Sequence, residues 1–421
     1  MLPRCTVSGI SWVDSLFIST SAVCVTGLTS VDVASTFTTP GFVVIILLIQ
    51  IGGLGVMTLT SFFAMFFMGN TSFYNQLVVR DMVSSNSLGS LLSTLLYILG
   101  FTLVIEGIGM VSIWFSIHNT LGMNLEEELA FAAFHSISAF CNAGFDLFGR
   151  FGPYSSLAPY VHNYYVQFVI MFMIISGGLG FMVWVELAEY RKKRRLSLHA
   201  KVVLQFSAIF WVGGAVLLAL LEWSNPRTMG GLSVPGKIMA ALFQSVSTRT
   251  AGMNTIDLAA CSPISKLLMS VLQFIGAAPG STGGGVKVTT FAVLILTIRS
   301  VAQGRDDCVI GGHHIESKTV YRALTIIVIG AVAAFGSAVV VYYNTAETVS
   351  VIDCIFESCS AFGTVGLSVG VTGQLNTGAK LLYMACMFMG RVGPVSLAIS
   401  LTAKPDDNKR KVLPVGHINV G

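Results

Sequence analysis

The sequence predicts an all-α polytopic membrane protein in which four similar helix–pore loop–helix units surround one central pore. Three observations predict this fold. Charged residues make up only 10% and hydrophobic residues 54% of the 421-residue chain, whereas average soluble proteins carry about 25% charged residues. Apolar stretches of about 20 residues recur, each long enough to cross roughly 30 Å of hydrocarbon. One short motif also recurs in every expected unit, which predicts an internal repeat.

The apolar stretches define seven long helices and four shorter segments. The long helices are expected at 41–68, 88–117, 163–188, 199–223, 263–298, 318–343 and 377–402. They carry few charges, as a helix must where its backbone groups bond only to one another. The shorter, more polar segments lie at 11–24, 127–141, 236–250 and 349–363. Because these are too short to span a bilayer, we expect re-entrant helices there.

The four short segments share the motif F-x-S-x-S followed by a glycine. The motif copies are Phe17–Ser21, Phe134–Ser138, Phe243–Ser247 and Phe356–Ser360, and the glycines are Gly27, Gly144, Gly252 and Gly366. Serines that pack between membrane helices are the simpler interpretation, but packing does not account for the shared glycine. The repeat divides the chain into units at 1–80, 81–195, 196–310 and 311–403, with a tail at 404–421.

The first unit is shorter at its start than the other three. An apolar helix begins 46, 45 and 38 residues before the motif phenylalanine in the second, third and fourth units, whereas only 16 residues precede Phe17. We therefore expect the first outer helix to be missing from this sequence because its start is truncated or mis-assigned. The alternative is a protein that works with seven full spans.

Basic residues fall mainly on one side of the predicted helices. Of the 24 Lys and Arg residues, 15 lie at the junctions between units or in the C-terminal tail, including the run Arg191–Arg195. Cytoplasmic loops of membrane proteins carry an excess of these residues. We therefore expect the junctions and the C-terminus in the cytoplasm, with the four short helices entering from outside. The net charge of +4 is too small to suggest a nucleic-acid partner.

Each glycine loop is suited to replacing the water around a cation. The C-terminus of a helix carries a partial negative charge, and loop carbonyls can replace a hydration shell where glycine permits the required dihedral angles. The strands that end at these glycines contain no carboxylate, so backbone carbonyls would provide the selectivity. The residues expected to coordinate a cation are Val25, Thr26, Gly27, Asn142, Ala143, Gly144, Thr250, Ala251, Gly252, Thr364, Val365 and Gly366.

These loops resemble the four selectivity filters of the Trk/Ktr/HKT potassium transporter superfamily, in its bacterial Trk/Ktr type. The resembling segments are 20–32, 138–146, 244–257 and 360–368, with inner-helix motifs at 48–58, 278–290 and 390–394. The resemblance covers nearly the whole chain and implies a pore-forming subunit for potassium uptake in the inner (plasma) membrane, not an enzyme. Some plant members carry serine at the first filter glycine and favour sodium, so Gly27 favours potassium. A sodium-permeable or sodium-coupled transporter is the alternative.

The inner helix of the third unit is interrupted by a glycine-rich run at 276–285. A single proline would only kink a helix, but this run holds five glycines and a proline. A phosphate-binding loop is excluded because the lysine spacing is wrong. By resemblance, the run is an intramembrane loop that obstructs the pore and moves during gating. The expected gate residues are Gly280, Gly283, Gly284, Gly285, Lys287 and Arg391.

The roles of the basic gate residues are left open by the sequence. Arg391 lies in an apolar span, where arginine is costly. By resemblance it is a cation barrier or a gate contact, and the alternative is an arginine that extends to the cytoplasmic boundary. Lys287 has either a gate role or a structural one. Arg249 is expected to support the third filter strand from behind, because a guanidinium would repel a cation.

The remaining expectations concern partners and other polar residues. The resemblance implies a homodimer and a separate cytosolic nucleotide-binding regulatory subunit, with no cofactor; potassium is the substrate and sodium a possible activator. Glu106 and Glu222 are expected to be helix–helix hydrogen-bonding or boundary residues rather than coupling carboxylates. Cys308, His313 and His314 match no structural zinc spacing, so a solvated loop is expected there.

Overall fold

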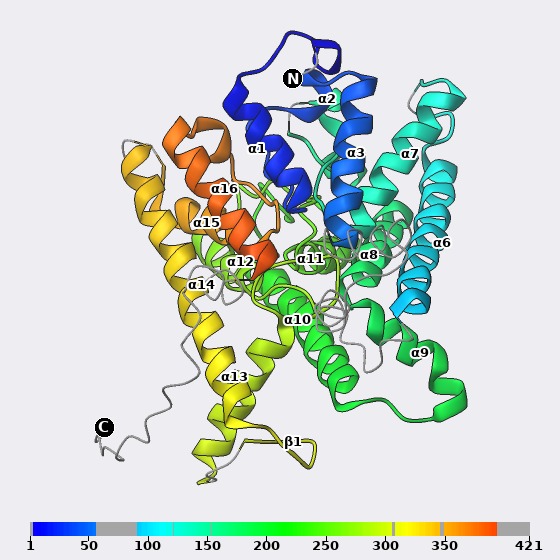
Figure 1. Ribbon diagram of the computed structural model, residues 1–421. Helices are drawn as coiled ribbons and strands as arrows, with labels where there is room; N and C mark the ends of the chain where they lie inside the picture. The colour runs from blue at the N-terminus through cyan, green and yellow to red at the C-terminus, as the bar shows by residue number, and fades with distance from the viewer. Residues whose placement is uncertain are drawn as a thin grey trace, which may run out of the picture.

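The computed structural model describes residues 3–55, 91–120, 122–152, 154–304, 308–345 and 349–393, which fold mainly as helices (Figure 1). The longer helices are α1 (Trp12–Val23), α3 (Thr39–Leu54), α6 (Leu91–Ile117), α7 (Leu125–Phe140), α8 (Tyr164–Gly178), α9 (Phe181–Lys193), α10 (Leu198–Glu222), α11 (Val234–Ser247), α12 (Pro263–Phe274), α13 (Val288–Ala302), α14 (Ser317–Asn344), α15 (Val351–Gly363) and α16 (Thr377–Val392). The shorter elements are η1 (Pro3–Cys5), α2 (Val33–Thr36), η3 (Phe148–Phe151), η4 (Ala158–Tyr160), β1 (Val309–Ile310), β2 (His313–His314) and η5 (Thr372–Gln374). The last part of the predicted span 41–68, the end of the span 377–402 and the tail 404–421 lie outside the described residues.

Three of the described helices are long and apolar enough to cross a membrane: α10, α14 and the Leu96–Ile117 part of α6. On α10, the side chains of Ile209, Val212, Val216 and Leu220 are more than half exposed. Their spacing of three or four residues places them on one face of the helix. A continuous exposed apolar face is unfavourable in water and marks contact with lipid.

The predicted span at 163–188 is not one straight helix. α8 and α9 meet at a bend of 98°, and Gly180 between them has a φ of +89°. A Cβ at Gly180 would lie 2.7 Å from the carbonyl oxygen of Pro279, so the turn requires glycine. Consequently α9 runs away from α8 (Figure 1), and its basic end at Arg191–Lys193 is exposed.

The predicted span at 263–298 is interrupted, as its glycine-rich run indicated. α12 ends at Phe274 and α13 begins at Val288. A bridge between Ile275 and Val286 closes the segment between them. Residues 275–287 therefore form a compact turn-back, which is called the glycine-rich loop below.

The four predicted short helices form as α1, α7, α11 and α15, with ends within three residues of those expected. Each begins at a residue whose side chain accepts a hydrogen bond from a backbone N–H of the first turn. These N-caps are Ser11, Asn124, Ser233 and Ser350. The motif phenylalanines at 17, 134, 243 and 356 are at most 1% exposed. The four helices thus have polar N-caps, and the residues that follow their C-termini are buried in the core.

Candidate functional site

The loops that follow the four short helices meet around one point. A Cβ added to Gly27 would contact Gly144, and one added to Gly144 would contact Gly252. A Cβ on Gly252 would contact Gly366, and one on Gly366 would contact Gly27. The four glycines therefore form one closed ring in chain order, which is called the glycine ring below.

The backbone has the same unusual conformation in all four strands of the ring. The glycines have φ angles of +91°, +70°, +74° and +91°. The residue two positions before each glycine also has a positive φ, which is uncommon for a residue with a side chain. These residues are Val25, Asn142, Thr250 and Thr364. Such strain persists only where the surrounding structure holds it, and it concentrates at functional sites.

The residue before each ring glycine places its carbonyl oxygen beside the glycine of a neighbouring strand. These residues are Thr26, Ala143, Ala251 and Val365. A Cβ at Gly27, for example, would lie 2.5 Å from the oxygen of Ala143. The ring thus excludes side chains at the glycine positions. It brings together all twelve residues that were predicted to coordinate a cation, and all twelve are buried.

The second serine of each motif holds the strand that follows it. Its backbone oxygen accepts a hydrogen bond of 2.8–3.0 Å from the residue before the ring glycine in all four units. The hydroxyls of Ser21 and Ser360 also accept a bond from the N–H of their ring glycine. Those of Ser138 and Ser247 donate to the carbonyl that follows the glycine. These serines therefore support the strands rather than only packing between helices.

The first serine of the motif bonds to a neighbouring helix in the second, third and fourth units, whereas Ser19 of the first unit bonds back to its own helix. Ser136 Oγ donates to the backbone oxygen of Glu106 on α6 (2.6 Å), and Ser245 Oγ to that of Trp211 on α10 (2.7 Å). The Glu106 carboxylate accepts a bond from Gln50 Nε2 on α3 (3.2 Å). Glu106 is therefore a helix–helix hydrogen-bonding residue, as expected. The packing interpretation therefore describes the first serine in these three units and not the second serine.

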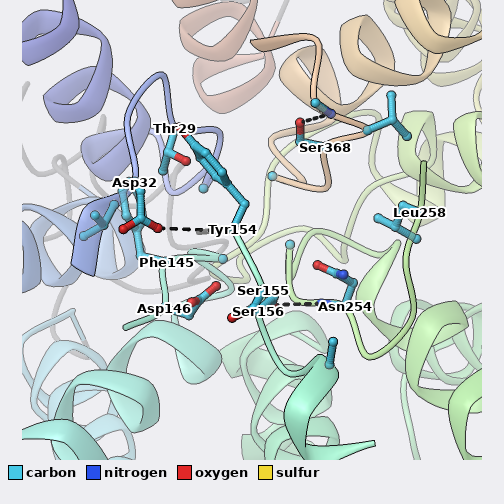
Figure 2. Close-up of a pocket in the computed structure, with 18 of the residues that line it drawn as sticks. Thr29, Asp32, Phe145, Asp146, Tyr154, Ser155, Ser156, Asn254, Leu258 and Ser368 are labelled. Atoms are coloured by element: carbon cyan, nitrogen blue, oxygen red, sulfur yellow. Dashed lines mark hydrogen bonds between the residues drawn. The ribbon is translucent and has the colours of Figure 1, made fainter. Parts of the chain in front are cut away.

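A cavity of 410 Å³ adjoins the ring on the side of the residues that follow the glycines (Figure 2). Asp32, Asp146 and Asp257 contribute three carboxyl groups to its lining. The pKa of the Asp146 carboxyl is raised to about 6, mainly by burial and also by the nearby Asp32, while the N–H of Phe148 opposes the shift. The cavity is therefore acidic and leads directly to the ring.

Sequence reasoning missed this acidic cavity, although a signal was present. Asp32 and Asp257 each follow their ring glycine by five residues, and Asp146 follows its glycine by two. The carboxylates lie after the glycines and not in the strands that precede them. Only the closure of the ring places the three residues around one space.

The glycine-rich loop lies on the opposite side of the ring. A Cβ on Gly283 would contact the side chain of Thr250, and one on Gly284 would contact that of Thr364. Thr282 Oγ1 donates to the carbonyl oxygen of Phe140, the last residue of α7 (3.1 Å). The loop therefore packs against the third and fourth strands of the ring and against the end of α7, the short helix of the second unit.

The loop also closes onto the ends of the inner helices. The N–H of Gly285 donates to the oxygen of Gly390 on α16 (3.1 Å), and the oxygen of Gly280 accepts from the N–H of Phe181 on α9 (3.0 Å). Lys287 Nζ donates to the oxygen of Gly283 (2.5 Å). The lysine thus bonds within the loop itself.

Arg391 connects the loop to two inner helices. From α16, its guanidinium donates to the carbonyl oxygen of Thr282 in the loop and to that of Gly52 in the last turn of α3. A cation is favoured at a helix C-terminus, where carbonyls are unpaired. This geometry matches a contact with the loop and not an arginine that extends to the boundary of the membrane.

The other basic and acidic residues singled out have packing partners. Arg249 donates from Nη2 to the oxygen of Gly276 (2.6 Å), and its guanidinium carbon lies 4.9 Å from the ring centroid of Phe210. It joins the residue before the third strand to the start of the glycine-rich loop and to α10, and its role as a support of the strand stays a prediction. Glu222, at the end of α10, accepts from Ser265 Oγ at the start of α12 (2.5 Å). It joins two helices, also as expected.

Three inner helices end at glycines with nearly the same backbone. Gly55, Gly180 and Gly393 follow α3, α8 and α16 with φ angles of +87°, +89° and +95°. The sequence carries the signal as G-G-L-G at 52–55 and 177–180 and G-R-V-G at 390–393. Sequence reasoning used the first and third copies and missed the second, and it therefore missed the bend after α8.

Long apolar helices, four short helices whose following loops close into one ring, and a glycine-rich loop beside that ring define a multi-pass helical membrane protein with a central site. The chain belongs to the TrkH family of cation transport proteins, whose model matches residues 5–411. It is therefore a membrane cation transporter of that family.

Individual relatives cover most of the chain. It is 38% identical over 407 residues to the Ktr system potassium uptake protein B of Vibrio alginolyticus, covering 96% of this chain and 87% of that protein. It is 35% identical to the potassium/sodium uptake protein NtpJ of Enterococcus hirae, covering 96% and 88%. The crystal structure of the potassium transporter TrkH from Vibrio parahaemolyticus has the same fold, with a TM-score of 0.73, 20% identity, and coverage of 94% of this chain and 79% of that one.

Proposed function

We propose that this protein is the pore-forming subunit of a potassium uptake system and that the glycine ring is its selectivity filter. The observation that carries the proposal is the closed ring of four strands with the same backbone conformation and with carbonyl oxygens between them. Rings of backbone carbonyls replace the hydration shell of potassium in selective channels. The names of relatives as potassium uptake proteins support the same ion.

The geometry supports a path from the acidic cavity through the ring. Cations gather at Asp32, Asp146 and Asp257, because a lining of one sign of charge raises the local concentration of the opposite ion. They lose water at the ring, where four helix C-termini add partial negative charge. The membrane potential then drives them inward.

Beyond the ring, the glycine-rich loop serves as the gate. Its contacts with Thr250 and Thr364 place it directly against the strands, and Arg391 holds it to α3. Opening then requires these hydrogen bonds to break and the loop to move aside. Deleting part of 278–285 is expected to raise flux in a folded, normally expressed protein; unchanged or lower flux would contradict a gating role.

A sodium-permeable or sodium-coupled transporter is the second candidate, because one relative is named a potassium/sodium uptake protein. Potassium is favoured by glycine at all four ring positions, including Gly27. Radioactive rubidium uptake in cells that lack their own potassium uptake tests the choice. Strong rubidium uptake that potassium competes with better than sodium is expected. Absent rubidium uptake with persistent sodium flux would overturn the proposal.

The assembly is also part of the proposal. A homodimer in the inner membrane, with a cytoplasmic C-terminus and a separate cytosolic nucleotide-binding regulator, fits a relative named as a member of a Ktr system. The exposed basic end of α9 supports a cytoplasmic position for this junction. Protease access to the tail 404–421 only from the cytoplasmic side would test the orientation.

A further inference from the structure

We propose that Glu357 and His135 are positioning residues that hold two opposite strands of the glycine ring and set how strongly it prefers potassium over sodium. This inference rests on the proposed function of the ring as a filter. Both residues occupy the first x of the motif F-x-S-x-S. The four side chains at this position are Ile18, His135, Gln244 and Glu357, and each is at most 2% exposed.

Glu357 ties the fourth unit's post-ring segment to its short helix. Its carboxylate accepts four hydrogen bonds from residues that follow Gly366. The donors are Ser368 Oγ (2.6 Å), the N–H of Val369 (3.0 Å), the N–H of Thr372 (2.8 Å) and Thr372 Oγ1 (2.5 Å). Four donors match the acceptor capacity of an ionised carboxylate, and bonds to an ionised acceptor are stronger than neutral ones. The exit of the fourth strand is therefore fixed from behind.

His135 makes the same connection in the second unit with different chemistry. Its Nδ1 lies 2.8 Å from the oxygen of Phe131 and donates to it, which leaves Nε2 to accept the N–H of Leu147 (3.1 Å). Leu147 is the third residue after Gly144, and Val369 is the third residue after Gly366. Two units thus anchor the same backbone N–H to the same motif position.

The other two units lack this support. The side chain of Ile18 has no acceptor, and neither polar atom of Gln244 has a partner among the described residues. Because the ring runs in chain order, the second and fourth strands lie opposite each other across it. One pair of opposing strands is therefore held from behind, and the other pair is free of this tie.

Fixing one pair of strands affects how well the ring can coordinate ions of different size. Sodium is smaller than potassium, so carbonyls must move inward to coordinate it well. Strands fixed at their exits resist that movement, whereas untied strands follow the smaller ion. Selectivity in such filters can come from the size of the cavity or from the field of the carbonyl groups, and the balance depends on how flexible the ring is. In this proposal, Glu357 and His135 control that flexibility.

The test compares potassium and sodium as competitors of rubidium uptake by full-length variants in potassium-uptake-deficient cells. Glu357→Gln keeps the shape but turns an NH₂ group toward N–H and O–H donors. We expect sodium to compete about tenfold better in this variant, because a buried donor loses its partner. Thr372→Val removes one donor and should act in the same direction. Gln244→Met, at the same motif position in the third unit, is the matched control and should leave the ratio unchanged.

His135 provides a rescue series. His135→Leu removes the acceptor and should lower the potassium preference, whereas His135→Gln keeps an acceptor near Nε2 and should restore part of it. If Glu357→Gln does not fold, Thr372→Val and the His135 pair decide the question. Folded variants with the wild-type competition ratio, or an equal change in Gln244→Met, would overturn this inference. Lack of rubidium uptake by the wild-type protein would instead refute the proposed function.

Discussion

The glycine ring and the lower ends of the inner helices come from the same four sequence units, yet only the ring is regular. In the ring, every strand has two left-handed residues and a serine that supports it. At the inner-helix ends, three units stop at a glycine, whereas the third opens into the glycine-rich loop. Equivalent strands suit coordination of an ion from all sides, while obstruction requires one unit that differs.

A substitution that disrupts the regular glycine ring should have the largest effect on uptake. Gly366→Ala adds a Cβ that would collide with the carbonyl of Thr26 and strains a φ of +91°. Since misplacement of about 1 Å in a tuned site costs roughly 100-fold, we expect rubidium uptake to fall by about that factor or more. Gly373→Ala, beside the same cavity and with nothing within 4 Å of the added Cβ, is the control. Normal uptake by Gly366→Ala would mean that ions do not pass through the ring.

A substitution that releases the glycine-rich loop should instead raise uptake. Arg391→Ala removes the hydrogen bonds that join the loop to α3. If those bonds stabilise the closed loop, initial uptake should rise by about fivefold or more. Arg227→Ala, an exposed arginine distant in sequence from the loop, should have no effect. A folded Arg391→Ala protein with reduced uptake would show that the arginine supports conduction instead.

External pH should change uptake through the acidic cavity. With a pKa of about 6, the Asp146 carboxyl is charged at pH 7.5 and mostly protonated at pH 5. Acidifying the outside should therefore lower uptake about two- to threefold by weakening the attraction of cations to the cavity. Asp146→Asn should have the lower rate already at pH 7.5 and little change between pH 7.5 and 5. The same pH profile in Asp146→Asn as in the wild type would assign the titration to another group.

The smallest effect is expected from removing an ion pair that joins the fourth unit to a neighbouring unit, and it concerns stability. Lys266 bonds to Asp353 and Lys380 to Asp14, each at 2.6 Å and each largely buried. Lys380→Met should lower the unfolding midpoint in detergent by about 2–4 °C, because it leaves a carboxylate without its partner. Lys193→Met removes an exposed pair with Glu189 and should leave the midpoint unchanged. Equal midpoints for both variants would show that the buried pair adds no stability.

Local features of the site could be predicted from the sequence. Glycine adopts a positive φ more readily than any other residue, so the glycines that follow the second serine of F-x-S-x-S by five or six residues located the strands of the ring. The glycine-rich run predicted the break between α12 and α13 for the same reason. Apolar length located α6, α10 and α14, because span length is a property of the segment itself.

Features that depend on contacts between units could not be predicted. The close approach of Pro279 to Gly180, almost 100 residues earlier in the chain, is one such contact, although G-G-L-G at 177–180 marked the place of the bend. The donor for His135 is a backbone N–H, which the sequence does not distinguish from any other. The acidic cavity required three loops to meet, and Arg391 found its acceptors on α3 and in the loop only through the packing of three units.

Locating the transported ion would test the central claim most directly. The structure would be determined with rubidium in place of potassium, and its anomalous scattering measured. We expect a peak on the axis of the glycine ring, bounded by the carbonyl oxygens of Thr26, Ala143, Ala251 and Val365. A transport-competent protein with rubidium bound elsewhere and no peak in the ring would contradict the account.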